Sequence, residues 1–348
     1  MAYSNLIQVI RSKSYAGFIP NYSAGMDKSL DRTEPPVGSK VLLSIYSRYQ
    51  ELWLVQLLFD DLLDWHQWFW SARRLQPLGL ICLGSTPIAN DPDGSVDTMQ
   101  GARYESGLDN SPMYDGEFFN ASSGQMQLYD VGFSSMVAAD AEALAQLAAE
   151  LGRTEEQALL LAHAAELRGL ISQHLWLDEQ SVFTNKFPNG TFYPRISPTS
   201  FYALMANAST DQQAAAMVES WLLSADRLCV SLTWPQGVNP ECYWGLPSIN
   251  AADPAYPPLG YWRGYVWGPM AQLTYWSLDE YGHVPIVAAA RKALAVQMTE
   301  MGLNMWRLHG HVCENFNPHE DATECSGTRF YHWGALTFLI SFIEAGYM

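Results

Sequence analysis

Basic side chains are scarce in this sequence of 348 residues. Only 19 lysines and arginines stand against 36 aspartates and glutamates, which gives a net charge of -17 at pH 7. Such a charge repels the phosphates of nucleic acids and the anionic headgroups of membranes. The sequence also lacks any apolar run of the about 18 residues that a membrane-spanning helix needs. We therefore expect neither a nucleic acid nor a membrane as a partner, and a small neutral ligand fits the charge better.

Cysteine is also rare, and its spacing suggests no metal or redox motif. The five cysteines contain no C-x-x-C pair, which argues against a zinc ribbon and against a redox dithiol. Because five is an odd number, at least one cysteine is unpaired within the chain. They are Cys82, Cys229, Cys242, Cys313 and Cys325.

Aromatic residues, in contrast, are abundant. They make up 13% of the chain and include 13 tryptophans, while 48% of all residues are apolar. This composition is that of a globular protein with a sizeable core. Flat rings stack on the apolar faces of sugars, but they also fill cores. Composition alone favours the role of the aromatic residues in the core over a role in sugar binding.

The dominant period along the chain is helical. Thr154 and Gln157 predict a capping box, and the segment 154–176 that follows carries one buried stripe of apolar residues. The preceding segment, about 130–151, begins at Asp130 and stops at Gly152, so the two helices form a hairpin. The stripe consists of Leu160, Ala164, Leu167, Ile171 and Leu175. Further helices are expected at 4–13, 38–48, 51–73, 198–207, 210–224, 269–281, 285–306 and 330–346.

Two long segments, 74–128 and 225–268, break the helical rhythm. They are rich in Gly, Pro, Asn, Asp and Trp, and long irregular segments in a compact domain are usually functional or disordered. No linker, charge block or sequence repeat divides the chain. We therefore expect one domain over residues 1–348. Antiparallel helix pairs with elaborate loops predict an all-α fold, an α/α toroid whose loops surround a pocket.

Three loop motifs are candidates for the chemistry. The stretch Glu105–Asp115 presents Asp109 on a tight path, although an Asx turn is the alternative role for this carboxyl. Cys313-Glu-Asn-Phe-Asn-Pro318 places Glu314 shortly after a helix. The third motif is Gly260-Tyr-Trp-Arg-Gly-Tyr-Val-Trp-Gly-Pro269, which leads into a helix at its proline. It offers Trp262, Arg263 and Trp267 to a sugar.

Together these motifs resemble those of glycoside hydrolase family 63, in its branch similar to mannosylglycerate hydrolases, with a more distant likeness to trehalases. Ser-Gly-Leu-Asp-Asn-Ser-Pro resembles the family's general-acid loop, Tyr-Trp-Arg-Gly its sugar-binding turn, and Glu-Asn-Phe-Asn-Pro its general-base segment. Weaker likenesses lie in Asp31-Arg-Thr-Glu-Pro-Pro36 and in Trp333-Gly334. The resemblance implies an (α/α)6 barrel that hydrolyses a glycosidic bond with inversion. It further implies Asp109 as acid, Glu314 as base, and Trp262, Arg263, Trp267, Arg32 and Trp333 as substrate-binding residues.

The two carboxyls have separate tasks in this reaction. One protonates the leaving oxygen, while the other takes a proton from the water that attacks the opposite face of the sugar. Asp109 and Glu314 are 205 positions apart. Only a closed fold brings such distant residues to one sugar, and a ring of helices does so.

Two other classes of protein remain as alternatives. One is a non-catalytic carbohydrate-binding protein on the same barrel, which the presence of both carboxyls disfavours. The other is a polysaccharide lyase, whose uronate substrate would meet a strongly acidic protein. The resemblance implies an α-glucoside or an α-mannoside as the substrate, either a glycosylglycerate or an oligosaccharide. A glycerate carboxylate would need a cation, and Arg263 and Arg32 are the candidates for it.

No metal and no cofactor are expected. Asp91-Pro-Asp-Gly94 with Asp97 lacks the register of a calcium loop and predicts a polar turn. The acidic and histidine residues that flank Glu314 contain no H-E-x-x-H motif, and the expected chemistry needs no metal. These residues are His309, His311, His319, Glu320, Asp321 and Glu324.

The number of expected helices is smaller than a closed ring requires. About ten are expected, whereas six hairpins need twelve. The pattern of Asn5–Ile10 is typical of the last turns of a helix that begins earlier. We therefore expect that the first helix pair is missing and that an apolar groove is exposed, so that the isolated chain is prone to associate.

Overall fold

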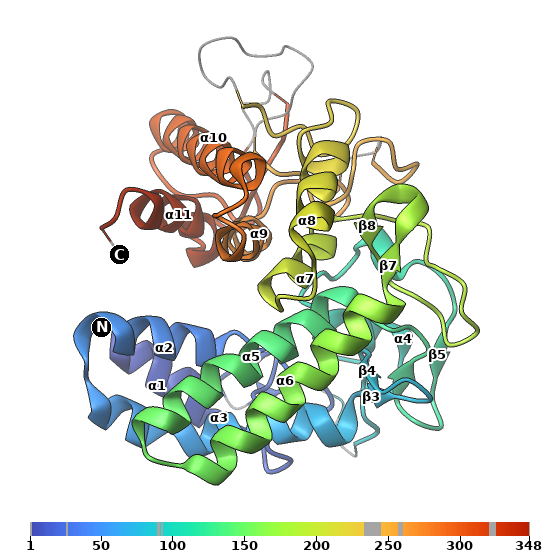
Figure 1. Cartoon of the computed structure of the whole chain (residues 1–348), viewed down its shortest axis with the longest axis vertical. Helices are drawn as coiled ribbons and strands as arrows, with labels where there is room; N and C mark the ends of the chain where they lie inside the picture. Colours follow the sequence, from blue (N-terminus) through green and yellow to red (C-terminus); the bar gives the residue numbers. More distant parts are fainter. Residues whose placement is uncertain are drawn as a thin grey trace. The chain divides into compact units, whose positions relative to one another are not determined.

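The computed structural model of the chain describes residues 2–25, 27–88, 91, 93–232, 245–256, 260–319 and 325–347. Two compact units make up the chain (Figure 1). The first unit comprises Met1–Asp109, Gly116–Leu175 and Asn185–Phe192. The second comprises Asn110–Asp115, Trp176–Thr184 and Tyr193–Met348. Asp109 thus ends a stretch of the first unit, and Asn110 begins the second. That the whole chain acts as one catalytic domain stays a prediction.

The first unit is built from helices. Its centre is α5, whose many alanines and serines let other elements approach closely, so that most of its residues are buried. α5 and α6 lie side by side as an antiparallel hairpin (Figure 1). Gly152 joins them with a φ of +71°, a conformation that favours glycine. The helices are α1 (Ala2–Arg11), α2 (Gly38–Tyr49), α3 (Leu52–Ala72), α4 (Met99–Glu105), α5 (Val131–Glu150) and α6 (Thr154–His174).

The apolar stripe expected on α6 is confirmed, since all five of its residues are buried. Asp130 is the N-cap of α5, where its side chain accepts a hydrogen bond from the Phe133 N–H at 2.8 Å. The capping box expected at Thr154 and Gln157 is wrong. Arg153 is the N-cap residue of α6, and the Gln157 N–H donates to the Arg153 carbonyl instead. A capping box does occur at Thr210 and Gln213, at the start of α8.

The second unit contains three main helices, α9, α10 and α11, together with shorter helices and turns. α9, α10 and α11 pack on one another (Figure 1). Pro269 lies in the first turn of α9, as expected, and Gly310 ends α10 with a φ of +71°. The α-helices are α7 (Tyr202–Met205), α8 (Asp211–Met217), α9 (Gly268–Glu280), α10 (Pro285–His309) and α11 (Leu336–Glu344). The short turns are the 3-10 helices η1 (Pro112–Tyr114), η2 (Asp178–Gln180), η3 (Pro198–Phe201) and η5 (His332–Ala335), and the π-helix η4 (Val218–Leu222).

Strands occur in the described residues only as short antiparallel pairs in the connections. Each pair joins two residues to two, so none forms a layer of the core. The first unit contains β1 (Ser23–Ala24) with β2 (Asp27–Lys28), β3 (Arg74–Leu75) with β4 (Leu80–Ile81), and β5 (Phe119–Asn120) with β6 (Gln125–Met126). The second contains β7 (Trp176–Leu177) with β8 (Val182–Phe183), and β9 (Asn315–Phe316) with β10 (Cys325–Ser326).

Every expected helix has helical residues in the described chain, but three are only partly α-helical. The segment 198–207 consists of the 3-10 turn η3 and α7, the segment 210–224 of α8 and the π-helical η4, and the segment 330–346 of η5 and α11, which begins at Leu336. The ends of the others are shifted by at most three positions. The helix α4 is an addition, because it lies inside the segment 74–128 that we expected to be irregular. The other irregular segment, 225–268, contains no helix in its described part before α9. It falls partly outside the described residues, at 233–244 and 257–259.

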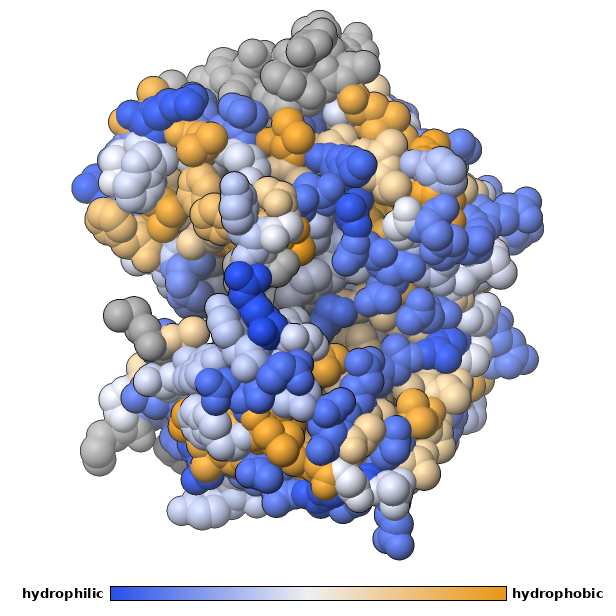
Figure 2. All heavy atoms as spheres, turned by 60° about the vertical axis from the view of Figure 1, so that its left-hand side comes forward, coloured by the Kyte–Doolittle hydropathy of each residue, from blue (hydrophilic) through white to orange (hydrophobic). Residues whose placement is uncertain are grey.

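Apolar side chains also reach the surface. Figure 2 shows them on one face in several patches, with hydrophilic side chains between. In the second unit Trp306, Leu308 and Phe342 are about half exposed, and in the first unit so are Val9 and Trp53. No helix of the described chain is both long enough and apolar enough to cross a membrane. The expected apolar groove and the missing helix pair stay predictions.

Candidate active site

The Tyr-Trp-Arg-Gly turn lies in the second unit and is held by backbone hydrogen bonds. The Arg263 N–H donates to the Gly260 carbonyl at 3.0 Å, and the Gly260 N–H donates to the Arg263 carbonyl at 3.3 Å. Tyr261 adopts a φ of +58°, which non-glycine residues seldom do. Such conformations persist where the surroundings enforce them, and they cluster at functional sites.

Two tryptophans make this turn rigid. The rings of Trp262 and Trp267 stack with centroids 3.8 Å apart and planes 7° apart, and the indole N–H of Trp267 donates to the Tyr261 carbonyl at 3.1 Å. Both side chains are buried, at 2% and 0% exposure. The partly exposed Trp333 meets both rings edge-on. Contact of these tryptophans with a sugar stays a prediction. The ring contacts show a cluster of three packed tryptophans beside the turn.

The close packing around Gly334 explains why a glycine follows Trp333. A Cβ added at Gly334 would lie 1.9 Å from the carbonyl oxygen of Cys313, so no larger residue fits there without moving the backbone. This close approach fixes η5, and with it Trp333, beside the segment that contains Glu314.

Glu314 is 8% exposed and its carboxylate has two hydrogen-bond donors on different segments. The Tyr261 hydroxyl donates to Oε1 at 3.0 Å, and the Thr328 N–H donates to Oε2 at 2.6 Å. The carboxylate is therefore held in one orientation by the sugar-binding turn on one side and by the chain after β10 on the other.

The acid loop reaches the same turn through Asn110, the residue that directly follows Asp109. The Asn110 side-chain amide donates to the Gly260 carbonyl at 3.2 Å, while its oxygen accepts from the Trp262 N–H at 2.9 Å. Both groups of this side chain are thus bonded to the turn, which ties two motifs about 150 positions apart.

Asp115, at the other end of this loop, lies between two arginines. Arg263 and Arg195 both form ion pairs with its carboxylate, and Arg195 also pairs with Asp253. The Tyr193 hydroxyl donates to the carbonyls of Pro112 and Asp115, at 2.9 and 2.8 Å. Arg263 keeps 27% of its side chain exposed. It is a cation fixed at one end that still reaches solvent.

Asp109 itself belongs to the first unit. It follows α4 by four residues, and its carbonyl accepts from the Gln100 side chain at 3.0 Å. The Leu108 N–H donates to the Ser106 hydroxyl at 2.9 Å. The path of the acid loop is therefore set by α4 and by local side-chain bonds.

Glu105, the last residue of α4, is anchored in the core of the first unit. Its carboxylate accepts from Arg73 Nε and Nη2 at 2.6 and 2.9 Å, and from the N–H groups of Thr33 and Gly84 at 3.0 and 2.9 Å. The side chains of Glu105 and Arg73 are 0% and 2% exposed. This pair fixes the end of α4 from which the acid loop departs.

Arg32 lies in the same unit and is 3% exposed. Its guanidinium donates to the side chains of Asn21, Asp31, Ser95 and Asp93. These contacts are those of a cation that holds loops together, and substrate binding by Arg32 stays a prediction.

Two residues after Arg32, Glu34 is a second carboxyl close to the acid loop. A Cβ added at Gly107 would lie 3.7 Å from Pro35, so the chain after Glu34 packs beside the loop that leads to Asp109. Burial raises the pKa of Glu34 to about 7. A carboxyl with this pKa is partly protonated near neutral pH and can donate a hydrogen bond.

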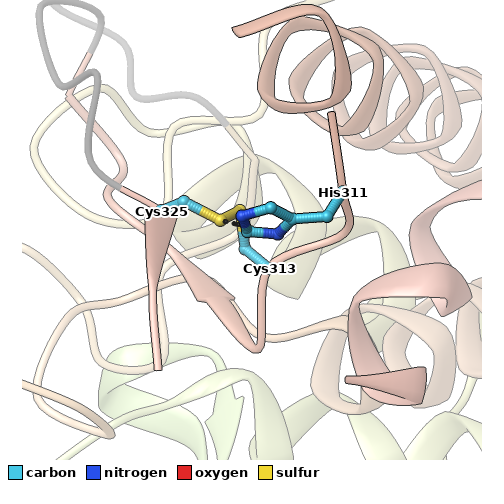
Figure 3. Close-up of side chains that lie close together, drawn as sticks. All are labelled: His311, Cys313 and Cys325. Atoms are coloured by element: carbon cyan, nitrogen blue, oxygen red, sulfur yellow. Dashed lines mark hydrogen bonds between the residues drawn. A yellow bond between two sulfur atoms is a disulfide. The ribbon is translucent and has the colours of Figure 1, made fainter. Parts of the chain in front are cut away.

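The polar turn expected at Asp91–Asp97 is confirmed, since Asp91 and Asp93 both accept from the Ser95 N–H at 3.1 Å. Of the acidic and histidine residues that flank Glu314, Glu320, Asp321 and Glu324 lie outside the described residues. Within the described chain, His311, Cys313 and Cys325 gather their ligand atoms within 4.8 Å of one another. The two sulfurs form a disulfide (Figure 3).

Sequence reasoning missed several residues of this arrangement. Tyr261 and Thr328 were not expected to hold Glu314, nor Asn110 to bond the turn, nor Asp115 to pair with Arg263. A signal existed for Asn110, which stands inside the acid motif next to Asp109. Thr328 acts through its backbone N–H, so its side chain left no signal.

Comparisons with known sequences find one family. A family model described as the mannosylglycerate hydrolase MGH1-like glycoside hydrolase domain matches residues 1–334. The curated proteins mannosylglycerate hydrolase MGH1 and mannosylglycerate hydrolase MGH2 of Selaginella moellendorffii are each 24% identical over 306 residues. Each match covers 72% of this chain and 56% of the relative, so the chain spans about half the length of these relatives.

Solved structures of similar fold include the GH63 mannosylglycerate hydrolase of Thermus thermophilus, in complex with glucose and in complex with Tris and D-glycerate. Both are 18% identical, with TM-scores of 0.69 and 0.71; the matches cover 97% and 98% of this chain, and 87% and 88% of those chains. Neutral trehalase Nth1 of Saccharomyces cerevisiae, also 18% identical, has a TM-score of 0.65 over 90% of this chain and 62% of its own.

These likenesses confirm the expected fold class, which is all-α and of the (α/α)6 toroid type. The family model covers nearly the whole chain, and the motifs that first suggested the family are the ones joined by hydrogen bonds in the second unit. The chain belongs to the mannosylglycerate hydrolase MGH1-like glycoside hydrolase family.

Proposed function

We propose that this protein hydrolyses an α-mannosidic or α-glucosidic bond with inversion, with Asp109 as general acid and Glu314 as general base. The observation that carries the proposal is the buried carboxylate of Glu314. It is oriented by Tyr261 in the very turn that Asn110, the neighbour of Asp109, also bonds. Family membership supports the class of reaction.

Glu314 suits the part of a base because its position is fixed before a substrate arrives. Its two oxygens accept from Tyr261 and Thr328, and each retains further lone-pair capacity for a water molecule. A water bonded to this carboxylate loses its proton as it attacks the anomeric carbon. A preset orientation reduces the entropy cost of that step.

Asp109 supplies the proton to the leaving oxygen. Inversion places the acid and the base on opposite faces of the sugar, with carboxyls roughly 6.5 to 9.5 Å apart so that water fits between base and sugar. Asp109 directly precedes Asn110, whose side chain bonds the turn.

The aglycone is the least defined part of the substrate. The solved relative from Thermus thermophilus is in complex with glucose in one structure, and with Tris and D-glycerate in another. Arg263 is the cation best placed to pair with a glycerate carboxylate, because it is partly exposed, whereas Arg32 is buried among four partners. This contrast favours Arg263 over Arg32 as the partner of a glycerate carboxylate.

A panel of α-linked sugars tests the proposal. We expect the protein to release reducing sugar from mannosylglycerate or glucosylglycerate, or from an α-glucoside such as an oligosaccharide, and to form no unsaturated product. Binding of these sugars without any hydrolysis would support the carbohydrate-binding alternative. An unsaturated product would instead identify a lyase.

The variant Arg263→Ala makes the panel informative about the aglycone. Since a hydrogen bond to a charged group is worth about 1.5 to 3 kcal/mol, KM for a glycosylglycerate should rise about 10-fold to 150-fold, with a smaller change for a neutral glycoside. Arg291→Ala is the matched control, because Arg291 pairs with Asp279 and Glu344 and has no described bond to the turn. Unchanged kinetics of Arg263→Ala on every hydrolysed sugar would remove Arg263 from the binding site.

A further inference from the structure

The base segment belongs to a small hairpin that is closed by a disulfide. β9 (Asn315–Phe316) and β10 (Cys325–Ser326) pair antiparallel, with Cys325 opposite Phe316 and Ser326 opposite Asn315. Cys313, the residue just before Glu314, is bonded through its sulfur to Cys325 (Figure 3). The disulfide therefore ties the start of the base segment to the strand that returns beside it.

The chain that follows this disulfide is the part that holds the base. Gly327 and Thr328 come two and three residues after Cys325, and the Thr328 N–H donates to Glu314 Oε2 at 2.6 Å. Gly327 has a φ of +76°, and a Cβ there would lie 2.2 Å from the same oxygen. The carboxylate rests against bare backbone, so a small shift of this chain would change its position.

The sulfur atoms have an imidazole beside them. Nδ1 of His311 lies 3.8 Å from Cys325 Sγ, and the ligand atoms of all three residues lie within 4.8 Å of one another (Figure 3). Cys313 is fully buried, whereas Cys325 is partly exposed. A reductant therefore reaches Cys325 first. Nδ1 of His311 also contacts the Val312 carbonyl at 2.9 Å, so the imidazole is held beside both sulfurs, within 4.8 Å of the departing Cys313 sulfur.

We propose that the Cys313–Cys325 disulfide is a redox modification site that sets the position of Glu314, with His311 assisting its cleavage. The proposal rests on the proposed function, in which Glu314 is the base. Oxidised, the disulfide keeps the Gly327–Thr328 backbone against the carboxylate. Reduced by a dithiol, the hairpin loses its covalent tie, and Glu314 loses the orientation on which turnover depends.

The chemical step is thiol–disulfide exchange. A thiolate of the dithiol attacks Cys325 Sγ, the bond between the two protein sulfurs breaks, and Cys313 leaves as a thiolate that takes up a proton. The second thiol of the reductant then attacks the reductant sulfur that is bonded to Cys325, and Cys325 leaves as a thiolate. Two electrons pass to the protein, which gains two thiol protons, and the dithiol becomes a cyclic disulfide.

The experiment compares the oxidised protein with the same protein treated with dithiothreitol, with a chelator present so that no metal ion binds the freed thiols. Because a displacement of about 1 Å costs up to about 100-fold in rate, kcat should fall 10-fold to 100-fold, while KM changes little. Reoxidation should restore kcat. The double variant C313A/C325A should have the low kcat under both conditions.

Control variants separate this disulfide from other effects. Cys82→Ala should respond as the wild type does, because Cys82 is a free, buried thiol. Cys229 is also disulfide-bonded, so a loss of activity that dithiothreitol still causes in C313A/C325A would assign the effect elsewhere and overturn the proposal. His311→Ala should slow the release of thiols without changing kcat of the oxidised protein.

Hydrogen exchange gives a readout that does not depend on catalysis. The Thr328 amide should exchange faster after reduction, because its acceptor Glu314 is no longer held against it. If no sugar is hydrolysed but this amide responds, the proposed function fails while the redox site stands. A reduced protein with two released thiols, full kcat and unchanged exchange at Thr328 would contradict the inference.

Discussion

Replacing Glu314 with glutamine should lower kcat by about two to four orders of magnitude while the protein stays folded. Glutamine preserves the shape and can still accept from Tyr261 or Thr328, but it cannot take a proton from water. The measurement is steady-state turnover of the best sugar in the panel, together with circular dichroism to verify the fold. KM should change little, because the binding groups of the turn are untouched.

Asp109→Asn should produce a loss of the same order, because the leaving oxygen would depart without a proton. A leaving group that needs no proton would recover much of this loss for Asp109→Asn and little of it for Glu314→Gln. Glu219→Gln, an exposed glutamate of the second unit, is the matched control and should behave as the wild type. Near-normal turnover in either variant would show that the residue has been misassigned.

The second large effect is expected on stability, from Glu105→Gln. The glutamine would leave the buried guanidinium of Arg73 without its counter-charge, and its amide would face donors that now meet a carboxylate. Removing one partner of a buried ion pair costs about 3 to 5 kcal/mol. Urea unfolding should show a midpoint that falls accordingly, and activity should fall too, since the acid loop starts at Glu105.

The control for this effect is Glu156→Gln. Glu156 pairs with Arg153 in the same unit, but both side chains are about one-third exposed, so solvent screens the pair and the urea midpoint should hardly move. Equal urea midpoints for the Glu105 and Glu156 variants would mean that the buried pair is not an anchor of the fold.

The helices were predictable because their signal is local. The stripe from Leu160 to Leu175 repeats every three to four residues, and burial of that stripe needs no knowledge of its partner. Asp130 and Pro269 likewise mark helix starts through interactions within one turn. Gly152 marks the end of a helix by its backbone conformation alone.

The capping box failed because two neighbouring positions competed to begin the helix. Thr154 and Gln157 have the right spacing, yet the helix starts one residue earlier than that box requires, with Arg153 as N-cap. The short helix α4 was not predicted, because its seven residues span less than two full helical turns. Its stability comes from the Glu105 contacts with Arg73, Thr33 and Gly84, which are distant in sequence.

The candidate site was predictable in its motifs and not in its bonds. The resemblance pointed to Glu314 and to the Tyr-Trp-Arg-Gly turn, but no sequence pattern says that Tyr261 bonds Glu314 or that Asn110 bonds Trp262. Such contacts depend on the packing of segments that lie 50 to 150 positions apart. The Cys313–Cys325 pairing was open for the same reason, because spacing alone does not determine connectivity.

The most direct test of the central claim is a proton NMR time course of hydrolysis that resolves the anomers of the released sugar. Two carboxylates that act on opposite faces of an α-linked sugar must release the β-anomer first, and mutarotation then forms the α-anomer. We predict that the β-anomer signal rises before the α-anomer signal in the wild type, and that Glu314→Gln shows no such early β-anomer signal. An α-anomer that forms first would contradict the roles of Asp109 as general acid and Glu314 as general base.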